Sequence, residues 1–207
     1  MKSPGAARLD FVRRGRGLEW LTVGWNLIEA VVSIVAGGAA GSIALVAFGL
    51  DSVIESMSGT ALLWRLRRDD PEQRERAERT ALRLVAVSFL LLAAYVAAES
   101  AHALWVREAP QSSLPGIVIA ALSLVVMPLL ARAKRRVAKG MESRALHADS
   151  RQTDLCAYLS AILLLGLGLN AVLGWWWADP VAGLAMVPII GREGLGAWRG
   201  RPCGCEQ

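Results

Sequence analysis

Two carboxylates four residues apart, Asp51 and Glu55, lie inside an apolar run that extends from Ser42 to Trp64. Residues at this spacing share one face of an α-helix, so the two side chains point the same way. An ionisable side chain near the middle of a membrane costs about 3 kcal/mol or more, and such residues commonly line ion pathways. The pair therefore predicts a site that handles a metal cation or a proton. The alternative is a hydrogen-bonded structural pair.

Two further polar residues reach the same depth if their runs cross the membrane as helices that rise about 1.5 Å per residue. Glu29 belongs to the preceding apolar run, and Cys156 belongs to a later one. Carboxylates combined with a thiolate or an amide suit a divalent cation. Zinc accepts oxygen and sulfur, whereas a set dominated by oxygen favours manganese, iron or magnesium.

The helix expected around Cys156 carries polar residues on two sides. Four of them fall within about 100° of one another: Asp149, Gln152, Thr153 and Cys156. Arg151 and Asp154 lie on the opposite side. We expect these two to form a mutual ion pair or to make contacts at a helix or subunit interface.

Two weaker candidates lie elsewhere in the chain. Glu99 and His102 are three residues apart, so they share a helical face, and they lie near the outer end of their span. We expect them to be either solvated or part of an accessory site on an exit path. Cys203 and Cys205 in the tail are candidates for a soft-metal chelate or for free, reduced thiols.

The composition predicts an all-α integral membrane protein. Of the 207 residues, 54% are hydrophobic, and several apolar runs exceed the length that a membrane-crossing helix needs. We expect one transmembrane domain over residues 18–198. Its six transmembrane helices are expected at about 18–36, 42–64, 79–106, 114–133, 145–169 and 179–198.

The layout of the basic residues predicts the orientation. Lys and Arg cluster before Leu18, between Arg65 and Arg83, between Arg132 and Arg144, and in the last residues of the chain. This alternation with apolar runs is the positive-inside pattern, and it places both termini in the cytoplasm. Residues 1–17 are then a basic lead and residues 199–207 a short tail. A nucleic-acid-binding surface does not explain clusters that alternate with membrane spans.

Local signals predict how several helices begin. Ser42 is suited to cap the second helix, and Asp70 followed by Pro71 is suited to start a long third helix over about 71–106. Asp179 with Pro180 is suited to cap the last helix. The run Trp175-Trp176-Trp177 is typical of an aromatic anchor at the membrane surface.

These features resemble the cation diffusion facilitators, which are zinc and manganese efflux transporters. Gly41-Ser42-Ile43-Ala44-Leu45, followed by Asp51 and Glu55, is similar to the family's second helix, where a GSxAL stretch leads to DxxxD. The segment Trp177–Gly183 is similar to the opening of the family's sixth helix. The resemblance covers about residues 18–198, and it implies a six-helix cation-efflux bundle, usually a homodimer.

The resemblance also assigns roles on the fifth helix. Placing Ala148-Asp149 on the family's AD sets Gln152 at the position of its His ligand and Cys156 at that of its Asp ligand. Cys156 must lose its proton to bind a metal well. The chain is similar to the small members of the family that lack a cytoplasmic domain, because only about nine residues follow the sixth helix.

The function expected from these signals is efflux of a divalent cation, Zn²⁺ first, with Mn²⁺, Fe²⁺, Co²⁺ and Cd²⁺ as alternatives. Asp51, Glu55, Gln152 and Cys156 are the expected metal ligands. Glu29, Asp149, Glu99 and His102 are expected in accessory or proton-linked roles, with protons exchanged for the metal. The expected location is the cell membrane, the inner membrane in a bacterium.

Two other classes of function are alternatives. The first is a membrane protein that binds metal and modulates a partner without transporting anything. The second is a membrane enzyme, and the sequence does not favour it, because it has no recognisable nucleophile–base pair or cofactor motif.

Overall fold

The computed structural model describes residues 4–65, 71–107, 109–141 and 144–199, and these form six α-helices. Their bounds are α1 (Pro4–Ala40), α2 (Ile43–Arg65), α3 (Pro71–Val106), α4 (Leu114–Met141), α5 (Arg144–Leu173) and α6 (Ala178–Trp198). The long third helix begins at Pro71 as expected. Asp70, Cys203 and Cys205 lie outside the described residues, so their expected roles stay predictions.

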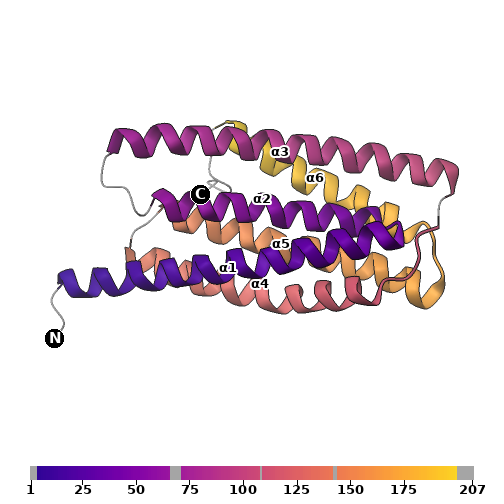
Figure 1. The fold of residues 1–207 in the computed structure, drawn as a ribbon, viewed down its shortest axis with the longest axis horizontal. Coiled ribbons are helices and arrows are strands. Elements are labelled where there is room, and N and C mark those ends of the chain that lie inside the picture. Colours follow the sequence, from indigo (N-terminus) through magenta and orange to yellow (C-terminus); the bar gives the residue numbers. More distant parts are fainter. Residues whose placement is uncertain (1–3, 66–70, 108, 142–143, 200–207) are drawn as a thin grey trace.

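The six helices lie side by side along the long axis of the molecule, and successive helices run in opposite directions (Figure 1). α2 contacts α1, α3, α5 and α6, and α5 contacts α2, α4 and α6. Within its span, 61% of α2 is buried, compared with 39% for each of the other four spans. The helix with the paired carboxylates is therefore the centre of the bundle.

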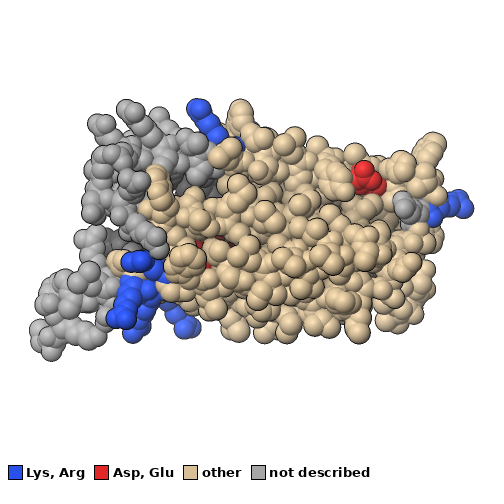
Figure 2. Space-filling view, viewed as in Figure 1, with Lys and Arg blue, Asp and Glu red and all other residues tan. Residues whose placement is uncertain are grey.

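Five of the six described helices are long and apolar enough to cross a membrane. The sixth, α6, is 21 residues long and carries Arg192 and Glu193 in its second half, and it does not belong to the five. On the face shown in Figure 2, the described Lys and Arg side chains lie toward the two ends of the molecule, with a broad band of other residues between them. The chain is a multi-pass membrane protein.

Two helices extend beyond the limits expected from hydropathy. α1 begins at Pro4, inside the segment expected to precede the first span, and α4 continues to Met141, past the expected end near residue 133. In both cases basic residues continue the helix beyond its apolar part. Hydropathy marks where a helix can meet lipid, whereas hydrogen bonding and packing decide where it ends.

The start of α2 is held by two capping side chains. Ser42 Oγ accepts a hydrogen bond from the Leu45 amide at 3.1 Å, which confirms the expected cap. Asp179 lies across from it and accepts hydrogen bonds from Ser42 Oγ at 2.5 Å and from the Ile43 amide at 2.9 Å. A carboxylate at this position also interacts favourably with the positive end of the α2 dipole.

The prediction that Asp179 caps its own helix is therefore wrong. No side-chain hydrogen bond caps α6, whose N-cap residue is Trp177. Asp179 is fully buried, and its oxygens are committed to the first turn of α2. The cause lies in the packing of the two helices. α6 begins beside the first turn of α2, whose backbone N–H groups have no acceptor within their own helix, and the Asp179 carboxylate accepts hydrogen bonds from them. Trp175 and Trp177 stack nearby, with ring centroids 4.9 Å apart.

Candidate cation site

Four chemistry-bearing side chains meet in the middle of the bundle. We call this set the central cluster, and its members are Glu29 on α1, Asp51 and Glu55 on α2, and Cys156 on α5. Each is at most 6% exposed, and the three carboxylates all lie within electrostatic range of the Cys156 thiol. The structure thus brings together the four residues that the sequence placed at one depth.

Glu29 is the best-satisfied carboxylate of the central cluster. Trp25 Nε1 donates to its Oε1 at 2.8 Å, and Ser52 Oγ donates to its Oε2 at 3.2 Å. Ser123 Oγ on α4 also donates to Oε1, and the Cys156 sulfur lies 3.9 Å from Oε2. Glu29 therefore joins α1 to α2, α4 and α5, and its oxygens are largely occupied by protein donors.

Asp51 and Glu55 hold the acceptors that remain free. Among the described residues, Asp51 accepts no hydrogen bond, and Glu55 Oε2 is buried without a partner. The other Glu55 oxygen accepts a hydrogen bond from Thr153 Oγ1 at 2.9 Å. A buried polar atom without a partner costs about 1–3 kcal/mol, so these oxygens are suited to a ligand that enters the protein.

The neighbouring helices carry further unpaired polar atoms. Within the part of the chain that the structure describes, both side-chain polar atoms of Asn26 on α1 are buried without a partner, and so is Nε2 of Gln152 on α5. Gln152 is 8% exposed, on the helix that also supplies Cys156. These amides add acceptor and donor capacity around the carboxylates, in accord with a polar interior through which an ion or water could pass.

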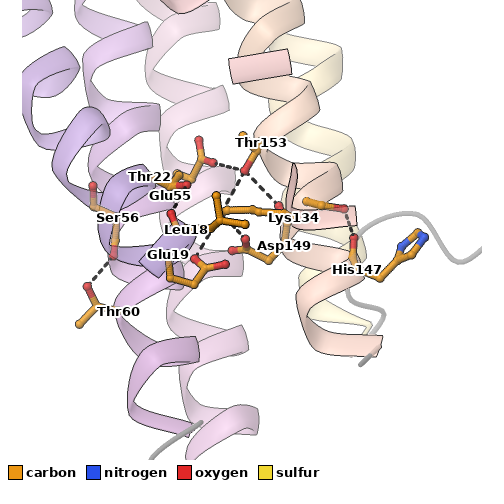
Figure 3. A network of polar contacts seen from close by, with 11 residues as sticks. Leu18, Glu19, Thr22, Glu55, Ser56, Thr60, Lys134, His147, Asp149 and Thr153 are labelled. Atoms are coloured by element: carbon orange, nitrogen blue, oxygen red, sulfur yellow. Dashed lines mark hydrogen bonds and ion pairs between the residues drawn. The ribbon is translucent and has the colours of Figure 1, made fainter. Parts of the chain in front are cut away.

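A second polar cluster is centred on a lysine that the sequence analysis did not single out. Lys134 on α4 is 0% exposed, and its Nζ lies 2.5 Å from Asp149 Oδ2 and 3.2 Å from Glu19 Oε2. It also donates to Thr153 Oγ1 at 3.3 Å. We call this set the lysine cluster: Glu19, Lys134, Asp149 and Thr153. Figure 3 shows Lys134 among these side chains, and it shows the hydrogen bond between Thr153 and Glu55.

Asp149, which the sequence predicts to have an accessory or proton-linked role, belongs to the lysine cluster and is buried against the ammonium group of Lys134. Asp154 on α5 forms an ion pair with Arg135 on α4. Of the two alternatives expected for Asp154, the structure therefore shows the contact at a helix interface. The mutual pair with Arg151 is not formed, because Arg135 reaches the carboxylate from the neighbouring helix.

Glu99 and His102 are exposed on the C-terminal half of α3, and the structure does not bring them to either cluster. Among the residues that the structure describes, no three His, Cys, Asp or Glu side chains lie close enough together to hold a metal ion as they stand. The acceptors around Asp51 and Glu55 would therefore be completed by amides, by water or by a small movement of a neighbouring ligand.

Two comparisons relate the chain to known proteins. Residues 20–199 match the cation efflux transmembrane domain. Transmembrane protein 163 of Xenopus laevis is 24% identical over 189 residues, which are 90% of this chain and 66% of that protein. The cation-efflux pump FieF of Shewanella oneidensis is 30% identical over 78 residues, which are 38% of this chain and 26% of the pump. The chain thus spans just under two thirds of the first relative and about a quarter of the second.

Proposed function

Because the chain belongs to the family defined by the cation efflux transmembrane domain, we propose that it exports a divalent cation, Zn²⁺ in the first place, from the cytoplasm. The family is one of transporters, not of enzymes. The observation that carries the proposal is the pair of buried carboxylates on α2, whose oxygens are incompletely hydrogen-bonded within the described part of the chain. Asp51 and Glu55 are buried and lie on one helical face. Within the described ranges, Glu55 Oε2 has no partner and Asp51 accepts no hydrogen bond.

We assign the ion to Asp51 and Glu55 with Cys156 and Gln152 of α5. Carboxylate oxygens and a thiolate are both good zinc ligands, whereas Gln152 offers a neutral and weaker oxygen. Glu29 would lie beside this site without binding the ion, because hydrogen bonds from Trp25 on α1 and Ser123 on α4 fix its carboxylate. Mn²⁺, Fe²⁺, Co²⁺ and Cd²⁺ are the competing substrates.

After the cation has left, the carboxylates of the empty site would bind protons while the transporter returns to its cytoplasm-facing state. Two carboxylates that lose their cation inside a membrane are costly to keep charged, so protons are the natural replacement. The basic end of the bundle, which we define as the end with Arg13 and Arg136, would face the cytoplasm by the positive-inside rule. Both termini would lie on that side, α6 would complete six spans, and the working unit would be a homodimer. Glu99 and His102 would mark the exit side.

Flux measured on purified protein tests the proposal. Proteoliposomes with a zinc-sensitive dye inside should show uptake that saturates with external Zn²⁺, together with an opposite movement of protons. Zinc binding without flux would contradict transport, and it would favour a membrane protein that binds metal and modulates a partner. Empty liposomes made in parallel measure the leak.

A further inference from the structure

Lys134 is an unusual residue for the inside of a transporter bundle. It lies seven residues before the end of α4, yet its side chain is fully buried. The basic residues on either side of it behave differently, because Arg132 and Arg136 are exposed and Arg135 is only partly buried. A charged group is kept in such a place only when it is well paired.

The ammonium group is held by carboxylates from two other helices. Glu19 comes from α1 and Asp149 from α5, so Lys134 of α4 bridges three helices at the basic end of the bundle. Glu19 Oε1 has no partner in the described part of the chain, so the lysine does not saturate its neighbours. When both carboxylates are ionised, one ammonium group leaves one negative charge unbalanced, and this charge is available to a second cation.

Thr153 connects the lysine cluster to the central cluster. Its hydroxyl accepts a hydrogen bond from Lys134 Nζ at 3.3 Å and can then donate its single proton to Glu55 Oε1 at 2.9 Å. The ammonium group and the proposed ion site are therefore one hydroxyl apart. Two positive charges at such a distance inside a protein repel each other strongly.

We propose that Lys134 is a tethered counter-ion. While the ion site is vacant, its ammonium group neutralises Glu19 and Asp149. When a divalent cation arrives, it displaces the ammonium group from these two carboxylates. This inference rests on the proposed function, since it supposes that a cation binds at Asp51 and Glu55. Lys134 is a positioning residue: its ammonium group holds Glu19 and Asp149 in one state and releases them in the other. A purely structural ion pair would instead stay in place when the cation binds.

The chain offers a direct way to observe this displacement. It contains only three lysines, Lys2, Lys134 and Lys139. Lys139 is exposed on the same helix, five residues beyond Lys134, and so serves as an internal reference. The probe is a water-soluble acetylating ester, applied briefly to the purified full chain in detergent with and without Zn²⁺. Mass spectrometry then reports acetylation of each lysine.

Without zinc, we expect Lys139 to be acetylated and Lys134 to be protected. Saturating Zn²⁺ should raise the acetylation rate of Lys134 by roughly tenfold and leave that of Lys139 unchanged. Asp51→Asn, which weakens the ion site and leaves the lysine cluster intact, should abolish the zinc-dependent increase. Zinc binding is measured on the same samples by equilibrium dialysis.

The outcomes separate the two claims. If zinc binds and Lys134 stays protected, the tethered counter-ion is overturned while the proposed function stands. If no zinc binds, the proposed function fails, and this inference fails with it. Lys134→Met gives a second test: without the competing ammonium, zinc should bind about tenfold more tightly, whereas Lys134→Arg should bind as the parent chain does. An unchanged affinity in a folded Lys134→Met variant would also overturn the proposal.

Discussion

At the scale of single residues, Cys156 is the side chain that would set which cations the proposed site prefers. Its sulfur is the one soft ligand among the carboxylates of the central cluster, and it is 1% exposed. Soft thiolates favour zinc and cadmium, whereas oxygen ligands suit manganese and magnesium. Cys156 stands where the resemblance places an Asp ligand in the family. A thiolate at this position would change the cation preference of the site.

Replacing the sulfur should change selectivity more than activity. Cys156→Ser keeps the size of the side chain and removes the thiolate, so we expect Zn²⁺ and Cd²⁺ affinity to fall by about tenfold or more while Mn²⁺ affinity changes little. Isothermal titration with each ion measures this. Equal losses for all three ions would show that Cys156 is not a ligand.

The same scale shows what the sequence could and could not provide. Asp51, Glu55, Glu29 and Cys156 were predictable as a group, because helical rise fixes their depth. Lys134 was missed because it stands in a basic run. Its position still carried a signal, because it lies on the buried face of α4. That face repeats at a spacing of three and four residues and consists of Met127, Leu130, Ala131, Lys134, Val137 and Ala138.

At the scale of elements, the start of α2 is fixed by the start of α6. Asp179 accepts hydrogen bonds from Ser42 Oγ and the Ile43 amide, and the Ala44 amide lies 3.4 Å from the same carboxylate. This junction sets the height of α2 in the bundle, and hence the level of Asp51 and Glu55. Sequence reasoning could identify a capping Asp, but it could not tell which helix the side chain would reach.

Removal of this carboxylate should loosen the bundle. Asp179→Ala leaves buried donors on α2 without an acceptor, so we expect a loss of about 2 kcal/mol and a clearly lower apparent melting temperature in detergent. Asp179→Asn retains one oxygen acceptor and should lose less. A melting temperature equal to that of the parent chain in the Ala variant would contradict the assigned cap.

At the scale of the whole molecule, two polar clusters adjoin each other inside the bundle. The lysine cluster is nearer the basic end, the central cluster is deeper, and Thr153 joins them. The helical architecture was predictable from apolar runs of sufficient length. The pairing of Lys134 with Glu19 and Asp149 was not, because it depends on which helices are neighbours.

The orientation of the molecule makes a further prediction. If the basic end faces the cytoplasm, Lys139 should be modified by a membrane-impermeant amine reagent in inside-out vesicles and protected in intact cells. The few lysines of the chain make the assignment of the labelled peptide simple. Labelling of Lys139 in intact cells would reverse the proposed direction of transport.

The central claim is that Asp51 and Glu55 form the transport site. Its most direct test is zinc flux into proteoliposomes by Asp51→Asn, measured beside Asp154→Asn, which alters a partly exposed carboxylate outside both clusters. We predict that Asp51→Asn abolishes zinc-dependent flux and that Asp154→Asn retains most of it. Full flux by Asp51→Asn would show that Asp51 is not part of the transport site.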